Sequence, residues 1–358
     1  MKKILIVGLG YAGRRYLRTF RHLADKLGLE IEMAYVGRRR RDEAIAHYLS
    51  VPQALLEFGP DLVVVSCNDH GHVGVLEDLA GFDGFVLCEK PLATPGDGWA
   101  RACVGLAHCR GFALNLIERY SDVTQHLRDL VARCDGTLVR ASFHWGKNRL
   151  NDYRPTCGVT SEVIHALDLV EWVGAPGTDL QLQQAIGVGS DFSISRDATP
   201  DTVLLTASLG GAVVAGYGSF VNVERQRTLD FTFVDPSGRI FHARGVYDTP
   251  AWDHDTLRVW TRDAAGRDVV IDELSVAPSG PGLETLHKLS RLCEDVLCAS
   301  VPGGAPRQPF AGLDDAMRLQ RLLDAISRCL AATPLFARYV RGAPRVLVPE
   351  SADLERLG

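Results

Sequence analysis

The chain has 358 residues, of which 46% are hydrophobic and 23% charged, and its formal net charge at pH 7 is −5. This length allows two domains with sizeable cores, and the composition is that of an ordinary globular protein. The weakly negative charge gives no electrostatic basis for binding nucleic acid or an anionic membrane surface. No apolar run approaches the roughly 20 residues that span a bilayer, so we expect neither a nucleic-acid nor a membrane partner.

The first fourteen residues predict a dinucleotide-binding turn. Residues 4–7 are an unbroken aliphatic run, which is typical of a strand buried on both faces of a parallel sheet. Glycines at G-x-G-x-x-G spacing follow, and a segment with helical spacing of apolar residues comes next. Such a turn admits a pyrophosphate against the N-terminus of the helix. The expected cofactor contacts here are Gly8, Gly10, Tyr11, Ala12 and Gly13.

The end of the second predicted strand, residues 31–36, bears on the choice of cofactor. An NAD site usually places an acidic residue here for the ribose 2′-hydroxyl, whereas a 2′-phosphate requires a cation. This chain has Gly37 followed by four arginines, among them Arg38 and Arg39. Because arginine binds phosphate bidentately, we favour NADP(H) over NAD(H). The alternative is a solvated basic start to the next helix, offset by Asp42 and Glu43.

Two further buried strands are predicted at residues 61–67 and 85–88, with a helix at 73–80 between them. His70 and His72 stand two apart in the loop after the first of these strands. Nothing nearby completes a metal site, so a loop or helix-cap role is favoured and no metal is expected. The second strand ends in Glu89-Lys90-Pro91, at the edge where parallel sheets bind ligands.

The glycine turn, Asn68-x-x-x-His72 and Glu89-Lys90-Pro91 together resemble the glucose–fructose oxidoreductase / inositol dehydrogenase (Gfo/Idh/MocA) family. The E-K-P tripeptide is the more specific of these signals, whereas the gap from Asn68 to His72 is one residue longer than is usual in the family. The resemblance implies a cis Lys90–Pro91 peptide. It also implies that Lys90 lies beside the nicotinamide, binds the substrate and assists proton transfer. The further cofactor contacts expected are Ser66, Asn68, His72, Glu89, Lys90 and Pro91, with Gly37, Arg38 and Arg39.

A helix predicted over residues 158–173 carries the expected acid/base group, with Thr160 or Ser161 as N-cap. The family has the pattern G-G-x-x-x-D-x-G-x-H-x-x-D here, and His165 with Asp168 matches its H-x-x-D. The resemblance implies proton exchange by His165, whose ordinary pKa near 6.5 suits it. The family's first aspartate is Ser161 in this chain, and Glu162 lies about 100° further round the helix.

This departure leaves the proton donor open among Lys90, Tyr153 and His165. Arg119 is similar to an arginine that the family places beside its active site, with an ion pair to Glu118 or Asp122 as the alternative. The residues expected to contact substrate are Lys90, Arg119, Tyr153, Ser161, Glu162, His165 and Asp168.

We therefore expect an α/β fold: an N-terminal Rossmann domain with a doubly wound parallel sheet, then an α+β domain with a largely antiparallel open sheet. Strands are predicted at 111–116, 136–145, 203–209, 212–220, 229–234 and 238–243, a polar loop at 146–157, and helices at 283–300 and 313–329. We expect the Rossmann domain at residues 1–120 and the α+β domain at residues 121–312. The resemblance implies that a helix at 313–332 packs back on the Rossmann domain. A tail at 333–358 is expected to wrap the surface or to reach a neighbour. The resemblance also makes the open sheet a subunit contact, hence a homodimer or homotetramer.

The nine cysteines form no C-x-x-C pair and mostly lie in apolar runs, which indicates reduced thiols. Glycines and arginines interrupt the first apolar run at once, which predicts a first strand and not a signal peptide. Both observations favour the cytoplasm.

The expected activity is hydride transfer between NADP(H) and a carbonyl or hydroxyl carbon of a sugar, nucleotide-linked keto-sugar or cyclitol. The alternatives are an NADPH-dependent imine reductase of secondary metabolism, or a dinucleotide-sensing protein without turnover.

Overall fold

The computed structural model describes residues 1–41, 44–150, 154–193, 199–278, 285–332 and 335–339. They form two compact units, one built from Met1–Ile117 with Leu286–Gln320 and the other from Glu118–Thr285 with the residues after Gln320. Nowhere in these ranges is a helix both long enough and apolar enough to cross a membrane.

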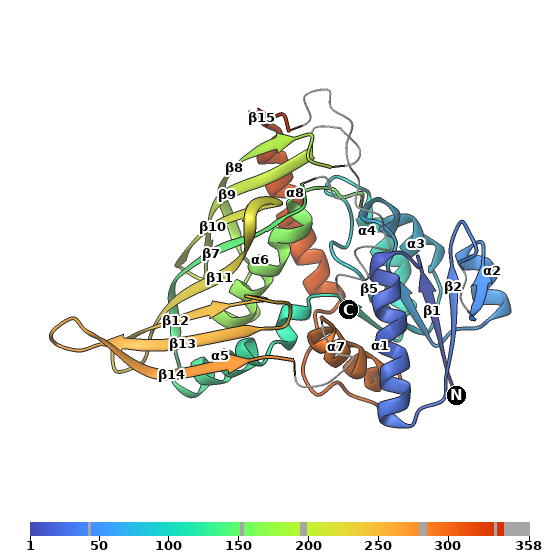
Figure 1. Ribbon diagram of the computed structural model, residues 1–358, viewed down its shortest axis with the longest axis horizontal. Coiled ribbons are helices and arrows are strands. Elements are labelled where there is room, and N and C mark those ends of the chain that lie inside the picture. Colours follow the sequence, from blue (N-terminus) through green and yellow to red (C-terminus); the bar gives the residue numbers. More distant parts are fainter. Residues whose placement is uncertain (42–43, 151–153, 194–198, 279–284, 333–334, 340–358) are drawn as a thin grey trace. The chain divides into compact units, whose positions relative to one another are not determined.

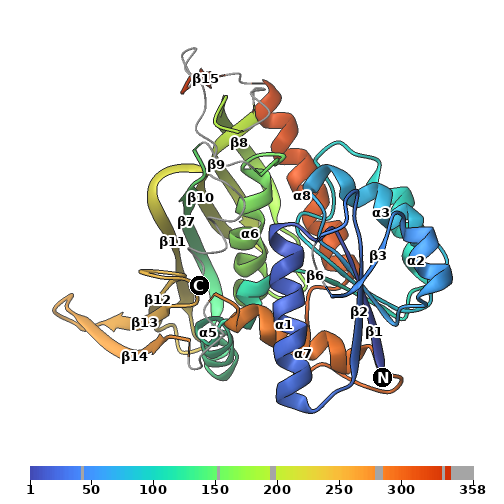
Figure 2. The ribbon, with the colours of Figure 1, turned by 45° about the vertical axis from the view of Figure 1, so that its right-hand side comes forward.

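The first unit is a doubly wound parallel sheet, as predicted. Its strand order is β3-β2-β1-β4-β5-β6, and every neighbouring pair is parallel. The aliphatic runs become strands because helices cover both faces: α1 and α7 lie on one side and α2 and α3 on the other (Figure 2). The strands are β1 (Lys2–Val7), β2 (Ile31–Val36), β3 (Ala46–Tyr48), β4 (Leu62–Val65), β5 (Phe85–Cys88) and β6 (Gly111–Leu114). The helices are α1 (Tyr11–Leu27), α2 (Val51–Glu57), α3 (His72–Asp78), α4 (Trp99–Gly105) and α7 (His287–Ala299), with short 3₁₀ turns η1 (Asp69–Gly71) and η2 (Leu106–His108).

The strand order reverses between β1 and β4, which is the topological switch point of this sheet. In open α/β sheets the crevice for ligands lies outside the carboxyl ends of the strands at this point. The glycine turn follows β1 and Ser66 follows β4, so both stand at that crevice.

Helix α7 departs from the expected division, which placed residues 121–312 in the second domain. It packs on α1, where Lys26 Nζ and Glu294 Oε2 are 2.9 Å apart. The apolar face of α7, which includes Leu289, Leu292 and Val296, is buried. An apolar helix face has to be buried, and α7 packs on α1 in the first unit.

The second unit contains a nine-stranded, largely antiparallel sheet, as expected. Its order is β14-β13-β12-β11-β7-β10-β9-β8-β15, and only the β7–β10 and β8–β15 pairs are parallel. Burial alternates along β9 because α5 and α6 cover only one face (Figure 1). The strands are β7 (Thr137–Asn148), β8 (Gln181–Ser190), β9 (Thr199–Leu209), β10 (Ala212–Ser219), β11 (Val221–Val234), β12 (Ile240–Val246), β13 (Asp255–Arg262), β14 (Asp268–Val276) and β15 (Leu335–Ala337). The helices are η3 (Ile117–Tyr120), α5 (Asp122–Arg133), α6 (Thr160–Gly174) and α8 (Leu313–Ala332), which begins in the first unit.

The predicted end of one strand of this unit was wrong. Strand β7 continues to Asn148, so the polar loop expected from residue 146 begins later. The predicted tail contains a strand, because Leu335–Ala337 pairs with the edge strand β8. Most of the rest of that tail, residues 333–334 and 340–358, lies outside the described residues.

Candidate functional site

The glycine turn can close only because two of its residues have no side chain. Gly8 has φ +95°, and a Cβ there would lie 2.8 Å from Cys67 Cα. A Cβ on Gly13 would lie 2.1 Å from the carbonyl oxygen of Gly8. Ser66 Oγ donates to this same carbonyl at 3.0 Å and so holds the turn against β4. These contacts explain the predicted roles of Gly8 and Gly13 physically.

The N-terminus of α1 fits an anion. Gly10 is its N-cap and makes no side-chain capping bond, and the first turn, which begins with Tyr11 and Ala12, has no acidic residue. Gly10 therefore offers no side chain to cap the backbone N–H groups of this turn, and the helix dipole favours negative charge there. The turn thus fits the diphosphate of a dinucleotide.

The arginines after β2 do not begin a helix, which was the alternative interpretation. They precede β3, and the backbone around them is held by aromatic rings. The phenol oxygen of Tyr35 accepts from Arg41 N at 2.6 Å, and His47 Nε2 lies 2.8 Å from the carbonyl oxygen of Gly37. Arg38 and Arg39 themselves are exposed. This anchored, exposed pair of cations is what a 2′-phosphate would require.

The segment after β5 is held from two sides. The Lys90–Pro91 peptide is cis, as the family resemblance implies. Glu89 Oε1 accepts from the Tyr16 phenol at 3.0 Å and from Asn115 Nδ2 at 2.6 Å. Lys90 therefore follows a carboxylate that two other elements fix in place.

The histidines of the preceding loop support this segment. His72 is fully buried, and its Nδ1 lies 2.7 Å from the carbonyl oxygen of Pro91. This is a supporting role and not the direct cofactor contact expected of His72. His70 Nδ1 lies 3.1 Å from Thr94 Oγ1, while Asn68 is exposed as the N-cap of η1.

Helix α6 begins at Thr160 with Val159 as its N-cap, so the expected capping by Thr160 or Ser161 is wrong. Ser161 Oγ instead donates to the carbonyl oxygen of Gly158 at 2.9 Å. Gly158 has φ +95°, and a Cβ there would lie 2.3 Å from the carbonyl oxygen of Pro200. Ser161 is buried and stabilises the tight turn at Gly158 that leads into α6. It stands at the position where the family has an acid.

Glu162 does not replace that missing acid, and its expected contact with substrate is not supported. It is fully buried, 2.7 Å from Arg227 Nη2 and 2.6 Å from Lys147 Nζ. Arg227 also pairs with Asp248 and, at 3.5 Å, with Glu118. Burial alone would lower the pKa of Arg227, but these carboxylates outweigh it and raise the pKa. Glu162 therefore lies between two cationic side chains.

Arg119 and Asp168 satisfy each other, which the sequence did not predict. Arg119 Nε donates to Asp168 Oδ2 at 2.9 Å, and both side chains are almost fully buried. The guanidinium carbon lies 4.2 Å from the centre of the Trp172 ring. Both residues thus have a structural role in tying η3 to α6, in place of the expected contact with substrate.

His165 remains the acid/base candidate of the second unit. It is 6% exposed, and its ring stacks on Trp145 with centroids 6.2 Å apart. Lys147, two residues further along β7, also lies on the side of the strand that faces α6. Sequence reasoning missed Lys147 because β7 was expected to end before it. Tyr153 lies outside the described residues.

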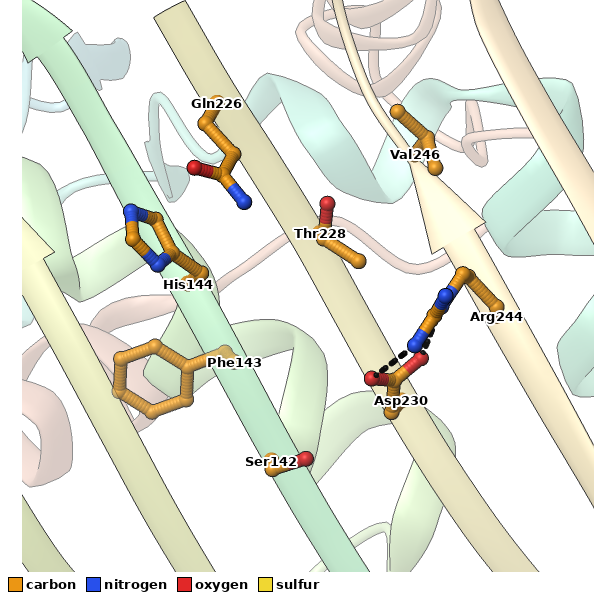
Figure 3. Close-up of a pocket in the computed structure, with 8 residues that line it drawn as sticks. All are labelled: Ser142, Phe143, His144, Gln226, Thr228, Asp230, Arg244 and Val246. Carbon is orange, nitrogen blue, oxygen red and sulfur yellow. Dashed lines mark hydrogen bonds and ion pairs between the residues drawn. The ribbon is translucent and has the colours of Figure 1, made fainter. Parts of the chain in front are cut away.

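A separate depression of about 360 Å³ lies on the sheet face of the second unit. Figure 3 shows its side chains standing side by side on β7, β11 and β12, with Asp230 and Arg244 paired. Burial lowers the pKa of His144 in its wall, against a smaller opposing effect of the hydrogen bond with Asn222. The lining residues are Ser142, Phe143, His144, Gln226, Thr228, Asp230, Arg244 and Val246.

Comparison with known proteins agrees with the geometry of the first unit. Residues 2–108 match the sequence model of the Gfo/Idh/MocA group, described as an oxidoreductase family with an NAD-binding Rossmann fold. This part of the chain is similar in sequence to the Gfo/Idh/MocA family. Inositol 2-dehydrogenase 1 of Saccharopolyspora erythraea is 29% identical over 185 residues, which cover 48% of this chain and 54% of that relative. The chain thus matches about half the length of this curated relative.

Solved structures share the fold over most of the chain. Levoglucosan dehydrogenase, in complex with NADH and L-sorbose, has a TM-score of 0.71 at 14% identity, covering 93% of this chain and 98% of that one. KijD10, a 3-ketoreductase from Actinomadura kijaniata in complex with TDP-benzene and NADP, has a TM-score of 0.68 at 12% identity, with 95% and 99% covered. The transcriptional regulator Gal80p from Kluyveromyces lactis has a TM-score of 0.69 at 14% identity, with 92% and 89% covered. At these identities the likeness to the solved structures concerns the fold alone.

Proposed function

We propose that the protein is an NADP(H)-preferring oxidoreductase. Its substrate is a sugar, a nucleotide-linked keto-sugar or a cyclitol, and hydride moves to or from the carbon that carries oxygen. The observation that carries this proposal is one sheet edge that holds the glycine turn after β1 and Lys90 after β5. The dinucleotide would supply the hydride chemistry, while the protein supplies binding, orientation and charge.

We assign the two candidate residues separate tasks. The ammonium of Lys90 binds the substrate oxygen and stabilises the negative charge that develops on it. His165 exchanges the proton of the substrate hydroxyl, since histidine is the side chain that most often acts as a general acid or base. Neither task requires an acid at position 161, where the Ser161 hydroxyl donates a hydrogen bond to the carbonyl oxygen of Gly158.

The experiment that tests this activity mixes the protein with NADPH and a panel of keto-sugars and imines, and follows the absorbance of the reduced nicotinamide. Lys90→Ala should lower turnover roughly 100-fold or more, as for a positioned acid/base group. Lys26→Ala is the matched control, because Lys26 pairs with Glu294 at the other end of α1. A near-normal rate for Lys90→Ala removes Lys90 from the mechanism.

The preference for NADP(H) rests on the exposed arginines after β2. Replacing Arg38 and Arg39 by alanine should weaken binding of NADPH by about 10-fold or more, since each arginine contributes charge-assisted hydrogen bonds to a phosphate. Binding of NADH, which has no 2′-phosphate, should change little. Equal weakening of both cofactors, measured by fluorescence titration, would show that the arginines do not select the phosphate.

A second candidate function is dinucleotide sensing without turnover. It is favoured by Ser161, which replaces the acid of the family pattern, and Gal80p shows that this fold also occurs in a transcriptional regulator. Tight cofactor binding with no turnover over the whole substrate panel would select this function.

We also infer a homodimer or homotetramer in the cytoplasm. The face of the sheet away from α5 and α6 exposes Ile186, Leu204 and Val213 by about half, and a subunit contact would bury them. The nine cysteines are free thiols, which suits a reducing compartment.

A further inference from the structure

The amide of Asn115 is held in one orientation at the carboxyl end of the first sheet. Asn115 follows β6 directly and is 6% exposed. Its Nδ2 donates to Glu89 Oε1 at 2.6 Å. The reverse orientation would bring two acceptor oxygens to this distance, so the amide oxygen must point away from Glu89.

Tyr16 completes a buried chain of hydrogen bonds with these two residues. Its ring has no exposed surface, and its phenol donates to the same Glu89 oxygen at 3.0 Å. Burial first, and then the charge of Glu89, raise the pKa of Tyr16, which therefore remains a donor. The main chain is fixed as well, since Asn115 N donates to the carbonyl oxygen of Cys88 and Glu89 N to that of Val65, both at 2.8 Å.

The amide oxygen at the end of this chain is buried and accepts no hydrogen bond from any residue that the structure describes. Buried polar atoms in native proteins are nearly always paired, and exceptions gather where a ligand binds. This atom belongs to a residue that contacts Glu89, directly before Lys90, at the sheet edge where Rossmann domains bind dinucleotides. The partner that it requires is a hydrogen-bond donor.

We propose that the Asn115 amide oxygen accepts a hydrogen bond from the carboxamide N–H of the nicotinamide, and that Tyr16 and Glu89 are positioning residues for this contact. The inference rests on the proposed binding of a dinucleotide. The carboxamide is the one part of the nicotinamide ring system that carries N–H donors. A contact there sets the rotation of the ring beside Lys90.

Three ligands separate this contact from the rest of the cofactor site. They are NADP⁺, its 3-acetylpyridine analogue, in which a methyl group replaces the carboxamide nitrogen, and 2′-phospho-ADP-ribose, which has no nicotinamide. The wild-type protein should bind NADP⁺ about 10-fold more tightly than the analogue, as expected for one well-made hydrogen bond. Binding is measured by calorimetry without substrate, so no turnover is required.

Asn115→Leu retains the shape of the side chain and removes both polar atoms. It should bind NADP⁺ and the analogue equally, while its affinity for 2′-phospho-ADP-ribose stays within about 2-fold of wild type. Tyr16→Phe retains the buried ring and removes only the phenol bond to Glu89. It should reduce the discrimination between NADP⁺ and the analogue to about 3-fold.

The outcomes distinguish this inference from the function on which it rests. If the wild-type protein binds none of the three ligands, the proposed function fails. If it binds them and Asn115→Leu still prefers NADP⁺ about 10-fold, the dinucleotide site stands and the Asn115 contact is refuted. Equal loss of affinity for all three ligands in Asn115→Leu also refutes it, because a nicotinamide contact cannot affect a ligand without nicotinamide.

Discussion

At the scale of single residues, burial determines what a charged side chain contributes to stability. Arg227, Glu162 and Asp248 are buried together and neutralise one another in part. Such pairs add little net stability compared with apolar packing, but removing one partner leaves an unpaired buried charge. The cluster therefore fixes where α6 begins relative to β11 and so restricts where His165 stands.

Asp201 is a buried carboxyl that predicts a pH dependence. It is 1% exposed, and this burial raises its pKa. A raised folded-state pKa means that the folded protein binds the proton more tightly than the unfolded chain does. The contribution of Asp201 is therefore most favourable below about pH 4, the ordinary aspartate pKa, and becomes unfavourable as pH rises through the raised value. Asp201→Asn should stabilise the protein more at neutral pH than at about pH 4, measured by urea unfolding.

Asp235 provides a control, because its pKa shifts in the direction opposite to that of Asp201. Its pKa is lowered, first by the hydrogen bond from Ser237 and also by bonds from Arg239. Its contribution is present above the unfolded pKa and is lost as pH falls through the folded one, so Asp235→Asn should cost stability only at the higher pH. The same pH trend for both variants would contradict the assignment for Asp201.

At the scale of elements, the unit of β1, the turn and α1 depends on backbone contact at Gly13. Gly13→Ala would place a methyl group 2.1 Å from the Gly8 carbonyl oxygen, so the turn must open. We expect lower stability and loss of dinucleotide binding, measured by thermal unfolding with and without cofactor.

Gly74 supplies the matched control for this substitution. It lies in α3, and a Cβ there would meet no atom within 4 Å. Gly74→Ala should raise stability by about 0.5–1 kcal/mol, because alanine loses less backbone entropy in a helix. Unchanged cofactor binding by Gly13→Ala would show that the turn does not need the close approach.

At the scale of the whole molecule, the half-covered sheet of the second unit predicts self-association. Ile186 and Leu204 stand opposite each other on β8 and β9, and Leu204 stands opposite Tyr217 on β10. Leu204→Arg combined with Val213→Arg should convert the oligomer to a monomer in sedimentation analysis, because burying an unpaired arginine is costly. Leu56→Arg on α2, where Leu56 is 86% exposed, should leave the assembly intact. A wild-type protein that sediments as a monomer would refute the contact.

The dinucleotide fold was predictable because its signals are local. The aliphatic run before Gly8 and the spacing to Gly13 need no distant partner to be interpreted, and both strand and turn were found where expected. Strands β8, β13 and β14 were missed because fewer than half of the side chains in each are buried, so apolar runs do not mark them. Asn115 and Tyr16 were missed as site residues, since their partner Glu89 is 26 and 73 positions away.

The sequence by itself determined the parallel sheet, the glycine turn and the Lys90–Pro91 segment, because each depends on a few adjacent residues. Tertiary structure alone decided the roles of the charged residues, because a carboxylate or guanidinium acts through the group it meets. Arg119 and Asp168 match the family pattern, but their side chains form an ion pair with each other. Glu162 lies between Arg227 and Lys147. Which polar atoms remain available to a ligand, the Asn115 oxygen among them, follows from that pairing and not from spacing along the chain.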